Sequence, residues 1–276
     1  MPEPVSLAKT VIEAGGLAWE NRGRIGKALG VVRRWFRRDS SILIIGPGGT
    51  GKTTLSRILS GEFDWLTDTP WKYEESYSAE RIRIRKRNVE AIIAPGQKLR
   101  RGTTWTKLKA DLAAGKFRGV ILVSAFGYHS ITGHASLAAV KPGKKKELAL
   151  AEFLTECRAD ELVVLRDLGE AMKLSPKKLW LLSLVTKQDL WLADEPAVQS
   201  HYSSGEYAAV VRQLASERGD QLFWHELTFA SLVISNWVAG RGERLGKNVE
   251  GYDHQAQVTS VRRVFDLLDG LRKWEK

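Results

Sequence analysis

The residues with the most definite chemistry lie in the stretch GPGGTGKT, from Gly46 to Thr53, which has the spacing G-x-x-x-x-G-K-[ST]. Glycines let such a loop curl so that its amide groups point at phosphate oxygens, and the N-terminus of a following helix favours negative charge. Lys52 would bridge the outer phosphates of a nucleotide, and the Thr53 hydroxyl would coordinate Mg²⁺. We therefore expect a phosphate-binding loop formed by Gly46, Gly48, Gly49, Thr50, Gly51, Lys52, Thr53 and Thr54.

A second polar group, TKQD, follows the apolar run LWLLSLV and contains Thr186, Lys187 and Asp189. A strand would deliver these residues to its C-terminal end, which is where doubly wound sheets bind ligands. A carboxylate at that place can accept both hydrogens from the N1 and N2 edge of guanine, a pair of donors that adenine lacks. The apolar stem of the lysine can lie over the plane of the base. We therefore expect GTP or GDP as the ligand.

A third group, APGQ at residues 94–97, follows the apolar stretch VEAIIA. With GPGGTGKT and TKQD it resembles the small Ras-like GTPases, whose motifs include [N/T]-K-x-D and D-x-x-G-Q. The order of GQKLRRGTTW and GVILV is similar to the ADP-ribosylation-factor-like and bacterial Ras-like branches, and the resemblance covers about residues 41–240. It implies that Gly96 senses the terminal phosphate and that Gln97 positions the attacking water. Ile93 stands where the family has an aspartate.

The resemblance implies a protein that hydrolyses GTP slowly to GDP and signals through two switch regions. Its catalytic residues would be Lys52 and Gln97. Mg²⁺ would be held by Thr53 and by a threonine of the first switch. Thr67 and Thr69 are the candidates, and Thr69 is favoured because the proline after it pushes its backbone towards an extended conformation.

Two alternatives stay open: a guanine-nucleotide-binding scaffold that does not hydrolyse GTP, and a phosphate-loop ATPase. The scaffold is favoured by Ile93, which removes an acidic group that would help to hold the water shell of the metal. WLADEP, with Asp194 and Glu195, resembles the Mg²⁺-binding strand of transporter-type ATPases, but it is too short for a separate strand and we expect a loop. Asp167 is expected within a helix. Ser231 would be the second wall of a guanine site, although its apolar neighbours favour a plain buried strand.

The elements that must position these groups alternate between strands and helices, which predicts an α/β fold with a doubly wound, mainly parallel sheet of the phosphate-loop type. Strands are expected at 41–46, 81–85, 89–94, 119–127 and 179–186 and within 221–235, and helices at 52–61, 159–173 and 260–274. We divide the chain into an N-terminal helical extension over 1–40 and a nucleotide-binding domain over 41–276, with an insertion at about 127–158.

The composition is that of a globular chain, with 276 residues, 43% hydrophobic, 27% charged and a net charge of +11. Twelve Lys or Arg and two acidic residues lie from Arg81 to Arg118. This charge favours an acidic protein effector at the basic switch region, and the alternative is a solvated face beside a nucleotide. The basic amphipathic pattern of residues 1–40 suits packing on protein or contact with a membrane surface.

Other sequence features bear on the partner and the cellular location of the protein. No zinc-finger, basic-zipper or aromatic RNA-binding signature occurs, so nucleic acid is not expected as a partner. A single cysteine, Cys157, excludes an internal disulfide, and the start of the chain lacks a secretory leader pattern, so we expect a cytoplasmic protein. His129, His134 and His225 are expected to be ordinary polar residues.

Overall fold

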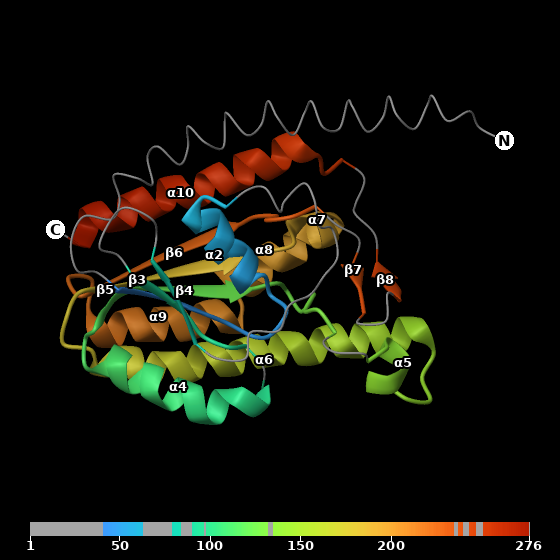
Figure 1. Ribbon diagram of the computed structural model, residues 1–276, viewed down its shortest axis with the longest axis horizontal. Helices are drawn as coiled ribbons and strands as arrows, with labels where there is room; N and C mark the ends of the chain where they lie inside the picture. Colours follow the sequence, from blue (N-terminus) through green and yellow to red (C-terminus); the bar gives the residue numbers. More distant parts are fainter. Residues whose placement is uncertain are drawn as a thin grey trace.

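The computed structural model describes residues 41–62, 79–83, 90–96, 98–131, 135–234, 237–239, 243–246 and 251–275. Its centre is a six-stranded sheet in the order β2-β3-β1-β4-β5-β6 (Figure 1). Neighbouring strands pair in parallel, except for the antiparallel pair of β2 and β3. The mainly parallel, doubly wound sheet is therefore confirmed. Its strands are β1 Ser41–Ile45, β2 Glu80–Arg83, β3 Glu90–Ile93, β4 Phe117–Ser124, β5 Leu179–Val185 and β6 Phe223–Phe229.

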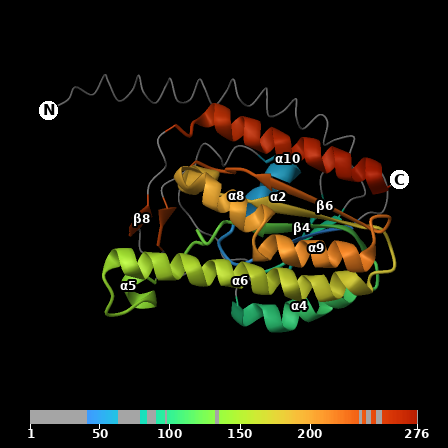
Figure 2. The same cartoon turned by 180° about the vertical axis from the view of Figure 1, so that it is seen from behind.

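Helices cover both faces of this sheet (Figures 1 and 2). Successive strand residues point to opposite faces, so Leu43 and Ile45 of β1 pack in one buried cluster while Ile42 and Ile44 pack in the other. A fully buried aliphatic side chain contributes roughly 1.5–3 kcal/mol, which explains why the central strands are almost entirely apolar. The first cluster packs under α4 Lys98–Ala113, α6 Lys146–Leu174, α8 Glu195–Ser203 and α9 Glu206–Arg218, and the second under α2 Lys52–Ser60 and α10 His254–Glu275.

A smaller unit projects beyond the end of the sheet (Figure 1). It consists of the first part of α6, the short helix α5 Leu137–Val140 and the antiparallel strands β7 Trp237–Val238 and β8 Arg244–Gly246. These elements share a separate cluster of buried residues: Ile131, Leu137, Ala149, Phe153, Trp237, Ala239 and Leu245. Much of the expected insertion at 127–158 therefore forms this unit.

The helices expected at 52–61 and 260–274 are confirmed, and Gly61 closes α2 in a left-handed conformation. The helix expected at 159–173 is also confirmed, as part of the longer helix α6, which begins at Lys146. One other expectation was wrong. WLADEP is not a loop: Leu192–Asp194 forms a 3₁₀ turn that leads into α8. Asp167 lies in α6 as expected.

The helix α4 was not foreseen, since Gly102 and two threonines lower the helix propensity of its first half. The helix expected over residues 1–40 lies outside the described residues. Among the helices that the structure describes, none is both long and apolar enough to span a bilayer.

Candidate nucleotide-binding site

The phosphate loop connects β1 to α2 at the C-terminal edge of the sheet. Thr50 Oγ1 and Lys52 Nζ both donate to the carbonyl of Pro47, at 3.0 Å and 2.6 Å. Gly51, in the left-handed region at φ 93°, turns the chain into the first turn of α2, and the N-terminus of a helix favours an anion. The Lys52 side chain is only 7% exposed, so its ammonium is held inside the curl of the loop.

The turn after β3 lies directly against this loop. The Ala94 amide donates to the Ile44 carbonyl at 2.9 Å, and the indole of Trp105 on α4 donates to the Pro95 carbonyl at 2.8 Å. A Cβ on Gly96 would lie 2.6 Å from two backbone atoms of the phosphate loop, the Gly48 nitrogen and the Pro47 carbonyl carbon, so only glycine fits there. The structure thus brings Gly96 to the phosphate loop. Gln97, Thr67 and Thr69 lie outside the described residues.

The TKQD residues follow β5, and the side chain of Thr186 joins them to the phosphate loop. Thr186 is 1% exposed, and its hydroxyl lies 2.7 Å from the carbonyl of Thr50 and 3.0 Å from that of Ser124. Lys187 adopts a left-handed conformation at φ 59° and begins the short helix α7 Gln188–Trp191. The Trp191 indole donates to the Thr186 carbonyl at 2.7 Å and fixes this turn.

Asp189 is 1% exposed and accepts a hydrogen bond from the hydroxyl of Ser231. The expectation that Ser231 belongs to a buried strand was wrong, because β6 ends at Phe229. The Ser231 amide donates to Tyr252 OH at 3.2 Å, so the residue is held from both its backbone and its side chain. Strand register could have found this pair: Phe229 pairs with Val185, which places Ser231 opposite the TKQD turn.

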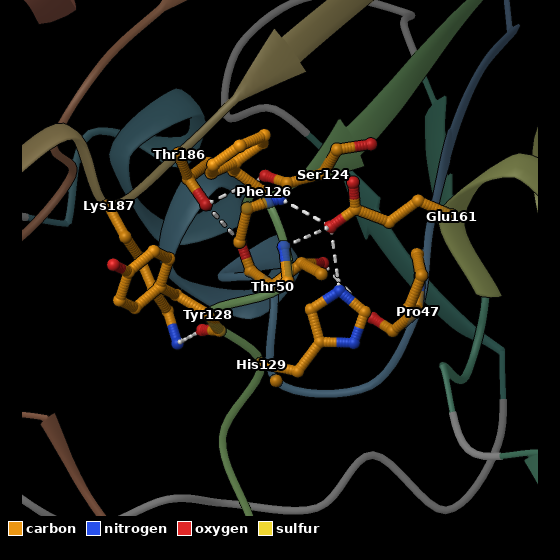
Figure 3. A network of polar contacts seen from close by, with 12 residues as sticks. Pro47, Thr50, Ser124, Phe126, Tyr128, His129, Glu161, Thr186 and Lys187 are labelled. Atoms are coloured by element: carbon orange, nitrogen blue, oxygen red, sulfur yellow. Dashed lines mark hydrogen bonds and ion pairs between the residues drawn. The ribbon is translucent and has the colours of Figure 1, made fainter. Parts of the chain in front are cut away.

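The side chain of Lys187 extends from the TKQD turn to the loop after β4. Its Nζ donates to the Tyr128 carbonyl at 2.6 Å and lies 3.3 Å from Ser130 Oγ (Figure 3). Burial lowers the pKa of the Lys187 ammonium to about 8, although the Asp189 charge acts in the opposite direction. The same loop contains His129, which is buried and bonds Glu161 Oε1 at 2.8 Å. His129 is therefore more than the ordinary polar residue that was expected.

The described residues fit a Mg²⁺ ion that arrives with a nucleotide. Thr53, in the first turn of α2, supplies a hydroxyl, but the place of the aspartate in a D-x-x-G-Q motif is taken by Ile93, which is 1% exposed in β3. No group of three or more His, Cys, Asp or Glu residues able to hold a metal occurs in the described part of the chain. Since Mg²⁺ keeps several waters and binds phosphates readily, the phosphates would have to supply most of its other ligands.

No protein-family model matches this chain, and no curated protein matches its sequence. Similar solved structures include the ADP-ribosylation-factor-like small COPII coat GTPase SAR1 from Encephalitozoon cuniculi in complex with GDP (14% identity, TM-score 0.48, covering 99% of this chain and 95% of that one). Toc33 from Arabidopsis thaliana in complex with Mg²⁺ and GMPPNP has 9% identity and a TM-score of 0.48, with 92% of each chain covered. The Arl6 BBS3 small GTPase from Trypanosoma brucei with bound GppNp has 16% identity and a TM-score of 0.35, covering 86% of this chain and 99% of that one.

Proposed function

We propose that this protein binds guanine nucleotides, hydrolyses GTP slowly to GDP and signals through its switch regions. The observation that carries the proposal is the buried hydrogen bond from the Thr186 hydroxyl to the Thr50 carbonyl. This bond holds the phosphate loop beside the turn that presents Asp189, and it therefore sets the distance between a phosphate site and a base site. A glycine turn that had arisen by chance would need no such connection.

Each end of the nucleotide would have its own partners. Amides of the phosphate loop and the Lys52 ammonium would bind the phosphates. Asp189, oriented by Ser231, would accept the two hydrogens of the guanine edge. Lys187, tethered to the Tyr128 carbonyl, would lie with its stem along the base.

Hydrolysis would depend on residues on either side of the terminal phosphate. Gln97 would orient the attacking water, while Lys52 would stabilise charge that develops on the phosphoryl oxygens. Thr53 and Thr69 would hold Mg²⁺, which neutralises phosphate charge when it is bound. Intrinsic turnover in this class can be as slow as ~10⁻⁴ s⁻¹.

The sharpest test of guanine binding is a melting panel with GTP, GDP and ATP. A ligand present at about 100 times its Kd stabilises by about 2.7 kcal/mol, which corresponds to roughly 5–10 °C for a domain of this size. We expect that shift with GTP and GDP, and no shift with ATP. Asp189→Ala should lose the shift, whereas Asp194→Ala should keep it because Asp194 is exposed. An equal shift of the melting temperature with ATP would contradict the guanine assignment and favour the ATPase alternative.

A non-hydrolysing scaffold is the second candidate, because the apolar Ile93 is buried in β3 beside the phosphate loop. Single-turnover hydrolysis of GTP in excess Mg²⁺ separates the two. Slow loss of GTP in the wild type and none in Gln97→Leu supports the enzyme. Tight GTP binding with no hydrolysis in either protein supports the scaffold.

We also propose an acidic protein effector for the basic switch region, and contact with a cytoplasmic membrane surface through residues 1–40. An effector held by charge should dissociate as ionic strength rises, because salt screens exposed charges over about 10 Å at 0.1 M. Sedimentation with vesicles of neutral and of anionic lipid tests the membrane contact, and equal absence from both pellets would contradict it.

A further inference from the structure

The segment Ala125–Ile131, here named the β4 loop, follows β4 and lies between the phosphate loop and α6. It begins with a tight turn in which the Tyr128 amide donates to the Ala125 carbonyl at 2.9 Å. Phe126 has a positive φ of 49°, which is uncommon for a residue other than glycine. Such a conformation costs free energy and persists only where the surroundings determine it.

The group that determines it is the carboxylate of Glu161, which lies in the middle of α6 with no exposed surface. Its Oε1 accepts from the Ala125 amide at 2.9 Å and the Gly127 amide at 3.1 Å, and lies 2.8 Å from His129 Nε2 (Figure 3). Its Oε2 accepts from the hydroxyl of Tyr202 on α8. Four groups thus converge on one carboxylate, which matches its capacity for hydrogen bonds.

The carboxylate is held in its charged form. Burial alone would raise the pKa of Glu161, but the bonds from His129, Tyr202 and the Ala125 amide bring its pKa below the ordinary value. An ionised carboxylate buried without partners would be strongly destabilising. The loop therefore depends on the complete set of donors around Glu161.

The opposite side of the β4 loop contacts the nucleotide site at two points. Ser130 lies against the phosphate loop: its amide and hydroxyl are each 3.4 Å from the Gly49 carbonyl, and a Cβ on Gly49 would approach the Ser130 amide to 2.4 Å. The Tyr128 carbonyl accepts from Lys187 Nζ. One loop thus contacts both the phosphate-binding residues and the base-recognition lysine.

We infer that Glu161 is a positioning residue for nucleotide binding, which fixes the β4 loop and through it the relative placement of Gly49 and Lys187. This inference rests on the proposed function. Glu161 contacts the loop rather than the expected place of the nucleotide, so its role is exerted through Ser130 and Tyr128.

The chain offers a matched pair of variants that separates positioning from general support of the fold. Tyr202 and Tyr207 are both buried, with ring centroids 4.8 Å apart. The hydroxyl of Tyr202 bonds Glu161 and accepts from the Phe126 amide at 3.1 Å, whereas that of Tyr207 lies 2.8 Å from Ser183 Oγ. Replacing either tyrosine with phenylalanine removes one buried hydroxyl, but only one of the two changes touches the β4 loop.

The experiment measures the affinity for a fluorescent GDP analogue well below the melting temperature. It also measures amide hydrogen exchange in the nucleotide-free protein. We expect Tyr202→Phe to weaken binding about 5- to 50-fold, the range for one or two buried hydrogen bonds. The amides of residues 49–53 and 125–131 should exchange faster. Tyr207→Phe should change affinity less than about twofold and leave exchange in both segments unaltered. Glu161→Gln, which keeps the shape of the side chain, should weaken binding at least as much as Tyr202→Phe.

Two results would overturn the inference. One is unchanged affinity in a folded Tyr202→Phe protein, and the other is an equal loss in Tyr207→Phe. If the wild type binds no guanine nucleotide, the proposed function fails and the exchange measurement decides alone. Faster exchange at 49–53 in Tyr202→Phe but not in Tyr207→Phe then supports the inference, and no difference between the two refutes it.

Discussion

The hydrogen bond between Thr186 and Thr50 gives the most direct prediction, through the change Thr186→Val. Valine has nearly the shape of threonine, so the packing of this 1% exposed side chain is kept while its hydroxyl is lost. The Ser124 carbonyl still accepts from the Thr186 amide at 2.8 Å, so the loss falls mainly on the Thr50 carbonyl. Leaving a buried acceptor without that donor costs about 1–3 kcal/mol.

We therefore expect the free energy of unfolding of the nucleotide-free protein to fall by about 1–3 kcal/mol in urea denaturation. If about 1 kcal/mol of that is needed to hold the loop in its bound geometry, GDP affinity falls about fivefold, because 1.4 kcal/mol is a factor of ten. Titration of a fluorescent GDP analogue measures this second quantity.

Thr228→Val is the matched control. Thr228 lies in β6 with no exposed surface, and its hydroxyl finds no hydrogen-bond partner among the described residues. The same chemical change should therefore leave stability unaltered or raise it by up to about 1 kcal/mol, with GDP affinity unchanged. The reasoning would be refuted if Thr186→Val bound GDP as tightly as the wild type, or if both variants lost the same stability.

Three further predictions concern other parts of the site and the core. Gly96→Ala should remain folded but weaken GTP binding at least tenfold by calorimetry, because its Cβ would collide with Lys52 Nζ and the backbone of the phosphate loop; unaltered affinity would contradict the close approach. Ser231→Ala should weaken GDP binding about 10-fold or more, since Asp189 loses a charge-assisted hydrogen bond of about 1.5–3 kcal/mol, and a melting panel should show the GDP shift reduced. Burial lowers the pKa of His225 to about 4, below its unfolded value of about 6.5. The unfolded chain then binds more protons between these values, so stability is lost as pH falls from 6.5 towards 4. The loss from pH 7 to pH 5 should be about 2 kcal/mol in urea denaturation, and His225→Gln should flatten this dependence; an identical slope in the variant would rule this group out as the cause.

Much of the fold and of the site could be predicted because the signals are local in sequence. The phosphate loop is a contiguous pattern between an apolar strand and a helix, and TKQD directly follows β5, a strand in which every residue is buried. The position of Gly96 beside the phosphate loop follows from a local signal too, since a strand ending beside β1 must bring its following turn to the loop after β1.

The parts that could not be predicted depend on residues far apart in the chain. Ser231 reaches Asp189 only because β6 lies beside β5 in the sheet, and its sequence neighbours resemble a continuing strand. Glu161 lies in a helix whose apolar pattern gives no sign that one acidic residue points inward. His129 was expected to be an ordinary polar residue because its spacing of five from His134 does not place the two on one helical face. Its partner, Glu161, comes from α6.

The continuity of α6 has a consequence for protein engineering. This helix runs without interruption from Lys146, in the small outer unit, past Glu161 to Leu174 under the sheet. Deleting residues 127–158 would therefore cut through a helix and also remove His129, one of the groups that offset the buried charge of Glu161. Residues 127–158 are therefore not a detachable module. A shortened version of the protein would have to keep the whole helix and redesign the surface of β7 and β8 that losing α5 exposes.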